Sequence, residues 1–195
     1  MSLLQMLQQR LSGDVVSRIS SRIGADPGTT GNAIDAALPL LLSALARNSQ
    51  DPAKARSLDA AVAQDHNGAI LEDVPRHVSA PDEQTGTGIL RHVLGGNQQT
   101  VQSGLSRATG LDADKVGSLL ATLAPLVMGA LGRAKQENGL DEKGLSTLLT
   151  KEQQNLNQSA PGAMTALSGL LDRNNDGSVV DDIGGLLGKA FGSKR

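Results

Sequence analysis

The chain has 195 residues, a net charge of −2 and no cysteine, and its only aromatic residue is Phe191. The scarcity of aromatic and β-branched residues excludes a typical β-sheet protein, and the near-neutral charge offers no basic surface for nucleic acid. Without cysteine there are no disulfides and no thiol chemistry. We therefore expect an all-α, multihelical protein whose core is built from Leu, Ala, Val and Ile.

Apolar residues at helical spacing predict four helices in the first part of the chain. Gly24 should end the second of them, which Ser12 or Asp14 can cap. Pro39 should kink the third helix or split it in two. Pro52 suits the first turn of the fourth. The four helices are expected over residues 3–11, 15–23, about 31–47 and 52–63.

A similar series of residues returns 86 positions later in the chain. Gly24 corresponds to Gly110, and the mid-helix Pro39 corresponds to Pro125. A proline inside a helix is costly. Its presence at both places favours an internal duplication of a helical unit over the chance similarity of two Ala/Leu-rich helices.

The duplication predicts an organisation in two related helical units joined by a glycine- and proline-rich segment. Asn97 should cap the first helix of the second unit, and a short helix should follow an Asp-rich loop near the C-terminus. The predicted parts are a first helical unit at 1–74, a packed connector with one short helix at 75–96, and a second helical unit at 97–195. Later helices are expected near residues 142–153, 161–171 and 181–191.

One segment, D-R-N-N-D-G-S-V-V-D-D at residues 172–182, has the spacing of an ion site. Oxygen-bearing side chains alternate at its start and a glycine follows, as in the helix–loop–helix calcium pattern. Oxygen ligands with no nearby histidine or cysteine favour Ca²⁺ over zinc or a redox metal. The candidate ligands are Asp172, Asn174, Asp176, the backbone carbonyl of Ser178, Asp181 and Asp182.

The match to the calcium pattern fails at the twelfth position, where Ile183 replaces the usual bidentate glutamate. The closing ligand would have to be Asp181 or Asp182, and the shorter, partly neutral ligand set predicts weak affinity. The alternative is a polar turn in which Ser178 or Asp181 caps the last helix without any metal. Residues 172–176 decide between the two interpretations.

Three further segments resemble a bacterial family of unknown function, number 937 in the domain-of-unknown-function series, which includes YidB-like helical proteins. They are D-H-N-G-A-I-L at residues 65–71, G-I-L-R-H-V-L-G-G at 88–96 and L-A-P-L-V-M-G at 123–129. The loop and the residues D-D-I that follow it at 181–183 are also similar to members of this family. The resemblance implies an all-helical bacterial protein of the cytoplasm or cell envelope. It brings no established activity, so no catalytic residue is implied.

The sequence as a whole predicts a non-enzymatic protein with one weak Ca²⁺ loop that orders the C-terminal helices. Self-association or binding to another protein is expected, because Leu/Ala-rich helices often present apolar stripes. No nucleic-acid partner, small molecule or catalytic residue is identified.

The N-terminus lacks the pattern of a signal peptide, and no window approaches the roughly 18 apolar residues of a membrane span. We therefore expect a soluble, cytoplasmic protein. The alternative function is a small-molecule-binding protein or enzyme that uses the glycine-rich connector 86–96 with His66 and His92. No two of the three histidines have the spacing of a helical metal site, and a capping or surface role is the simpler expectation for each, including His77.

Overall fold

The computed structural model describes residues 2–159, and every regular element within this range is helical. The all-α, multihelical fold class predicted from composition is confirmed. The elements are α1 (Leu3–Arg10), α2 (Asp14–Ile23), α3 (Pro27–Asn48), α4 (Pro52–Gln64), η1 (Ala69–Glu72), α5 (Val74–Ser79), α6 (Glu83–Leu94), η2 (Gly95–Asn97), α7 (Gln98–Thr109), α8 (Ala113–Asn138) and α9 (Glu142–Ser159).

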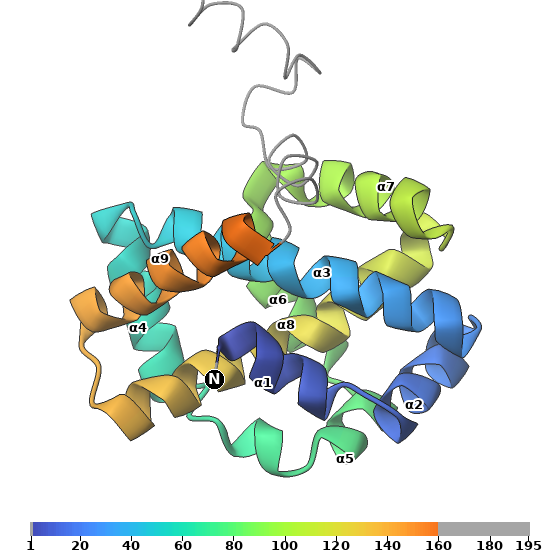
Figure 1. Ribbon diagram of the computed structural model, residues 1–195, viewed down its shortest axis with the longest axis horizontal. Helices are drawn as coiled ribbons and strands as arrows, with labels where there is room; N and C mark the ends of the chain where they lie inside the picture. The colour runs from blue at the N-terminus through green and yellow to red at the C-terminus, as the bar shows by residue number, and fades with distance from the viewer. Residues whose placement is uncertain (1, 160–195) are drawn as a thin grey trace, which may run out of the picture.

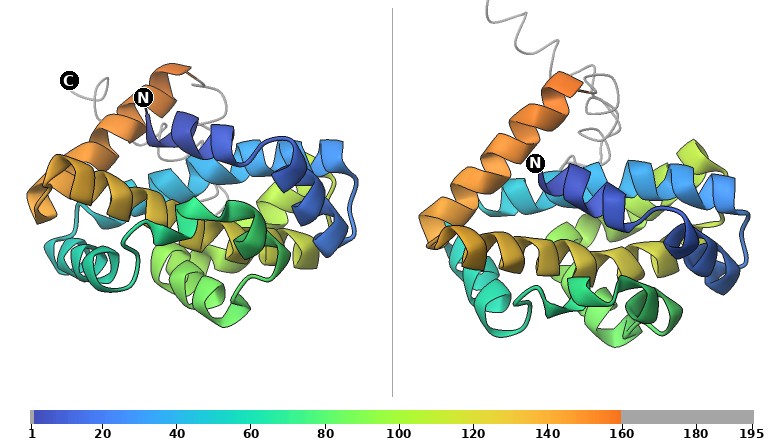
Figure 2. Two further views of the ribbon diagram at one scale, coloured as in Figure 1. Left: turned by 90° about the horizontal axis from the view of Figure 1, so that it is seen from below. Right: turned by 60° about the horizontal axis from the view of Figure 1, so that its bottom comes forward.

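Two long helices, α3 and α8, cross in the middle of the molecule, and the shorter helices surround them (Figure 1). Residues 40–46 of α3 and 119–132 of α8 are buried without interruption. Both stretches are apolar on all sides, which is the pattern of a helix enclosed by other helices. In Figure 2, α1 and α9 lie on one side of this pair, while α4, α5 and α6 lie on the other.

Three glycines let neighbouring segments reach α8 more closely than any side chain would allow. A methyl group added at any of them would overlap an atom across the contact. It would lie 2.1 Å from the Ala121 oxygen for Gly86, 2.4 Å from Ile70 Cγ2 for Gly129 and 1.6 Å from the His66 oxygen for Gly132. These contacts, here called the glycine joints, hold α6, η1 and the residues just before η1 against α8.

Pro125 interrupts the hydrogen-bond ladder of α8 inside the core. Because proline has no N–H, the carbonyl of Ala121 loses its usual partner in the helix. Gly86 packs against this carbonyl, and Nε2 of His77 lies 3.1 Å from the neighbouring Thr122 carbonyl oxygen. Elements α5 and α6 therefore approach α8 in the turn before Pro125, where the Ala121 carbonyl lacks its partner within the helix.

The first and last helices of the described part are joined by a buried carboxylate. Glu152 of α9 is only 4% exposed, and its Oε1 accepts the N–H of Leu3 at 3.0 Å. Leu3 is the first residue of α1, where N–H groups have no partner within the helix and the helix dipole favours a negative charge. This bond ties α1 to α9 across 149 positions of the chain.

A single apolar cluster runs from Leu3 of α1 to Leu156 of α9, so both predicted units contribute to one core. The elements of the two units correspond at the offset of 86 residues. Gly24 and Gly110 both end a short helix in the left-handed conformation, and the long helices begin at Pro27 and Ala113. The duplication itself stays a prediction, as does the division into units.

Several helix boundaries differ from those predicted. Helix α3 begins at Pro27, before the expected residue 31, because Asp26 accepts the Thr29 N–H at 2.8 Å and the proline occupies the first position. It also continues through Pro39 without being split. The segment 75–96 carries most of two helices, α5 and α6, in place of one.

Two predicted helix caps are absent. Gly13, without a side-chain hydrogen bond, precedes α2 in place of a cap by Ser12 or Asp14. Asn97 belongs to η2 and its side chain does not cap α7. The Asp-rich loop and the helices predicted after it lie outside the described residues.

Helix α8 is long and apolar enough to cross a membrane by length and composition, which the sequence analysis did not anticipate. However, 83% of its apolar 18-residue window is buried within the protein. A helix enclosed in this way passes the same test as a membrane span because it is apolar on every face. This observation is therefore weak evidence for a membrane.

The glycine joints predict opposite effects for two substitutions on the same helix. Gly86→Ala should lower the free energy of unfolding by about 1–3 kcal/mol, because its methyl group would overlap the backbone of α8. Gly88 has no atom within 4 Å of an added methyl group, so Gly88→Ala should be neutral or raise that free energy by about 0.5–1 kcal/mol. Urea unfolding followed by circular dichroism measures both, and equal stability of the two variants would contradict close packing at Gly86.

Candidate functional site

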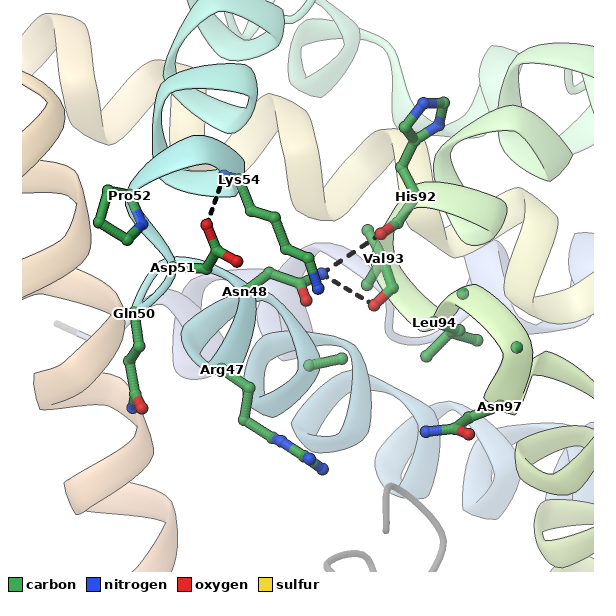
Figure 3. Close-up of a pocket in the computed structure, with 13 residues that line it drawn as sticks. Arg47, Asn48, Gln50, Asp51, Pro52, Lys54, His92, Val93, Leu94 and Asn97 are labelled. Atoms are coloured by element: carbon green, nitrogen blue, oxygen red, sulfur yellow. Dashed lines mark hydrogen bonds between the residues drawn. The ribbon is translucent and has the colours of Figure 1, made fainter. Parts of the chain in front are cut away.

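A cleft lies between the α3–α4 turn and the junction of α6 with α7 (Figure 3). We call it the α3–α6 cleft, and its volume is about 740 Å³. One wall comes from the end of α3 and the start of α4, and the other comes from the end of α6 and η2. The lining residues are Ala44, Arg47, Asn48, Gln50, Asp51, Pro52, Lys54, His92, Val93, Leu94, Gly95, Gly96 and Asn97.

Asn48 holds the two walls of the cleft together. Its Nδ2 donates to the backbone oxygens of Val93 at 2.9 Å and His92 at 3.3 Å (Figure 3). Both carbonyls lie in the last turn of α6, where helix oxygens lack partners within the helix. Gly95 ends α6 at a positive φ of 57°, which turns the chain into η2. The Asn48 side chain therefore links the two walls through backbone oxygens of α6.

The cleft lining is more cationic than anionic. Arg47 and Lys54 bring two positive charges, and Figure 3 shows the Lys54 side chain extending from α4 toward Asn48. Asp51 is the one carboxylate among the lining residues, and it accepts the backbone N–H groups of Ala53 at 2.8 Å and Lys54 at 3.3 Å. These hydrogen bonds lower the pKa of Asp51, so its carboxylate stays ionised and offsets one of the two positive charges. An acidic ligand would meet the positive side chains.

An apolar pocket of about 300 Å³ adjoins the cleft. The two cavities share Asn48, Lys54, His92 and Val93. Beyond these residues the pocket is lined mainly by hydrocarbon side chains from α3, α4, α6 and α8. They are Leu45, Leu58, Ala61, Ile89 and Met128, together with Ser57.

A separate cavity of about 260 Å³ brings together His66 and His77. Partial burial lowers the pKa of both imidazoles. For His77, its bond to the Thr122 carbonyl opposes this effect. Asp82 also lines the cavity, but it caps α6 by accepting the N–H groups of Gln84 and Thr85. His77 and Asp82 therefore already have structural roles.

The structure separates the residues that the alternative function would combine. His66 lines the cavity beside α8, whereas His92 lines the cleft and the apolar pocket. The glycine-rich connector 86–96 serves both regions, because Gly86 packs on α8 and its last two glycines line the cleft. The structure thus places His66 and His92 in different cavities, while the connector does border a cavity.

The calcium prediction falls on residues that the structure does not describe. Asp172, Asn174, Asp176, Ser178, Asp181 and Asp182 all lie beyond residue 159. Within residues 2–159, no three histidine, aspartate or glutamate side chains are grouped to hold a metal ion.

Sequence reasoning missed Arg47, Asn48 and Lys54 as candidate site residues. Each lies at the end or the start of a helix in a segment with no recognised motif. The only signal was the helix start at Asp51 and Pro52, which marks a turn and says nothing about a cavity. Their convergence with the end of α6 depends on tertiary packing.

The described helices form an all-α bundle with a cleft at the α3–α4 turn. The model of the family described as bacterial protein of unknown function (DUF937) matches residues 5–136. The chain therefore belongs to this family, as its sequence resemblance indicated. No curated protein and no solved structure gives a significant match to it.

The three segments that resemble the family have distinct places in the fold. Segments 65–71 and 123–129 meet at the glycine joints of α8, where Ile70 lies against Gly129. Segment 88–96 instead forms one wall of the cleft. Two of the three segments thus have a clear packing role, and the third borders the α3–α6 cleft.

The two half-buried histidines predict a loss of stability in mild acid. Their pKa values are lower in the folded protein than the usual value near 6.5, so the unfolded chain binds these protons more readily. Stability should therefore fall as the pH drops below about 6.5. The melting temperature, followed by circular dichroism between about pH 7.5 and 5, should fall less in the double variant His66→Gln/His77→Gln.

The lowered carboxyl pKa values of Asp26, Asp51 and Asp82 act below this pH window, since those groups titrate below about 3.9. An equal loss of melting temperature in the wild type and the double variant would show that the histidines do not cause it.

Proposed function

We propose that the chain is a non-catalytic binding protein that holds a small carboxylate in the α3–α6 cleft. The carrying observation is the charge of the lining, in which two cationic side chains, Arg47 and Lys54, stand against the single carboxylate of Asp51. A volume of about 740 Å³ is within the usual range for small-molecule sites. The bond from Asn48 to the end of α6 supports a pre-formed site.

The surroundings of the histidines support binding over catalysis. His77 and His92 each bond a backbone carbonyl, at 3.1 Å and 2.9 Å. A general base needs contact with the proton it removes, and a nucleophile would have to lie beside it. In the described part these imidazoles are engaged with the backbone. Self-association remains a second expectation, although between residues 2 and 159 every Leu, Ile, Val and Met is at least partly buried.

Titration with butyrate tests carboxylate binding in the cleft. The amide signals of Gly95 and Gly96 in a nitrogen-15 correlation spectrum should shift, because both glycines line the cavity. Lys54→Gln should weaken binding about two- to fivefold, the scale of one exposed charge pair. Lys143→Gln on α9 is the matched control, since it removes a lysine that does not line the cleft and should leave the affinity unchanged. Unmoved glycine signals at millimolar butyrate would contradict the proposal.

The Asp-rich loop supports a second candidate function, weak Ca²⁺ binding that orders the C-terminal part of the chain. The support is its spacing, with Asp172, Asn174 and Asp176 alternating before Gly177. Asp181 or Asp182 would close the ligand set. This function is compatible with a carboxylate in the cleft, because the two sites use different residues.

Calorimetry tests the calcium loop on the intact chain. The wild type should bind Ca²⁺ with a dissociation constant toward the weak end of the known range, on the order of 10⁻⁴–10⁻³ M, and its melting temperature should rise with Ca²⁺. Asp172→Ala/Asp176→Ala should abolish both effects, whereas the control Asp65→Ala should leave them unchanged. If the wild type neither releases heat nor gains stability, the loop is only a capped turn.

A further inference from the structure

The apolar pocket adjoins the cleft, and its chemistry is different. Hydrocarbon from four helices lines it, with Met128 of α8, a core residue 4% exposed, among the lining residues. The cleft beside it is polar and carries Arg47 and Lys54. Two adjoining cavities of this kind suit a molecule with one charged end and one apolar end.

We propose that the ligand of the cleft is an amphipathic carboxylate with a linear hydrocarbon chain, an inference that rests on the proposed function. The carboxylate lies near Lys54 in the cleft, and the chain enters the apolar pocket between Leu58 and Met128. Four residues line both cavities, and Lys54 among them brings its charge to the border of the apolar pocket. Charge complementarity selects an acid over an alcohol or an amine of the same length.

The volume of the apolar pocket limits the length of the ligand's hydrocarbon chain. A water molecule occupies about 30 Å³ of liquid, and a methylene group is of similar size. A pocket of about 300 Å³ therefore takes on the order of eight to ten carbons by this measure. Each methylene that enters should tighten binding about fourfold, which corresponds to about 0.8 kcal/mol. Beyond that length, each added methylene should tighten binding only slightly.

Calorimetry on the full chain tests this with butyrate, hexanoate, octanoate, decanoate and tetradecanoate. Affinity should rise steeply to about decanoate and then level off. Decanol and decylamine should bind at least about fivefold more weakly than decanoate, since the charge of the head group is then lost or reversed. Affinity that is independent of chain length, or equal for decanoate and decanol, would overturn the proposal.

Two neighbouring alanines on α4 test whether the hydrocarbon chain of the ligand lies in the pocket. Ala61 lines the pocket, and the adjacent Ala60 is exposed. Ala61→Leu should fill part of the pocket and weaken decanoate at least tenfold while leaving butyrate unchanged. Ala60→Leu should affect neither ligand. Melting temperatures of both variants report whether each is folded.

The outcomes separate this inference from the proposed function. If butyrate shifts Gly95 and Gly96 but longer acids bind no better, the carboxylate site stands and the amphipathic ligand is wrong. If no acid binds, both proposals fail. If decanoate binds equally to Ala61→Leu, its hydrocarbon chain lies elsewhere and the inference is overturned.

Discussion

The fold depends on how closely other segments can approach α8. With one aromatic residue in the sequence, the core has few large flat side chains to fill the space between helices. Glycines let the backbones come together instead. Gly86 of α6 packs against the Ala121 carbonyl, and Gly132 of α8 packs against the His66 carbonyl. Close packing of this kind tolerates little change, because a single methyl group exceeds the available space.

This close packing also positions the cleft. Helix α6 is fixed on α8 through Gly86, and its other end is tied to α3 by the bond from Asn48 to Val93. The wall of the α3–α6 cleft that α6 forms is therefore held near both ends of that helix. Pre-formed cavities bind with a smaller loss of conformational entropy than flexible ones. Among the three segments that resemble the family, residues 88–96 are the ones that form a wall of the cleft.

The fold class and most helices follow from the sequence, because apolar spacing, Gly24 and Pro52 are local signals. The candidate site does not, since Asn48, Lys54 and the end of α6 meet only through tertiary packing. Sequence reasoning also assigned Pro39 in α3 to a kink or a split helix, and that helix continues through the proline. In α8, the carbonyls before Pro125 are approached by other elements, which no local pattern reveals.

The methionine methyl groups allow the most direct measurement on the proposed ligand site. The chain has four methionines, of which Met128 lines the apolar pocket and Met6 lies on α1. In the intact protein with carbon-13 methyl labels and bound decanoate, the ligand chain should show nuclear Overhauser contacts to the Met128 methyl and none to Met6. Contacts to Met6, or bound decanoate without contact to Met128, would contradict the assignment of the α3–α6 cleft and its pocket as the binding site.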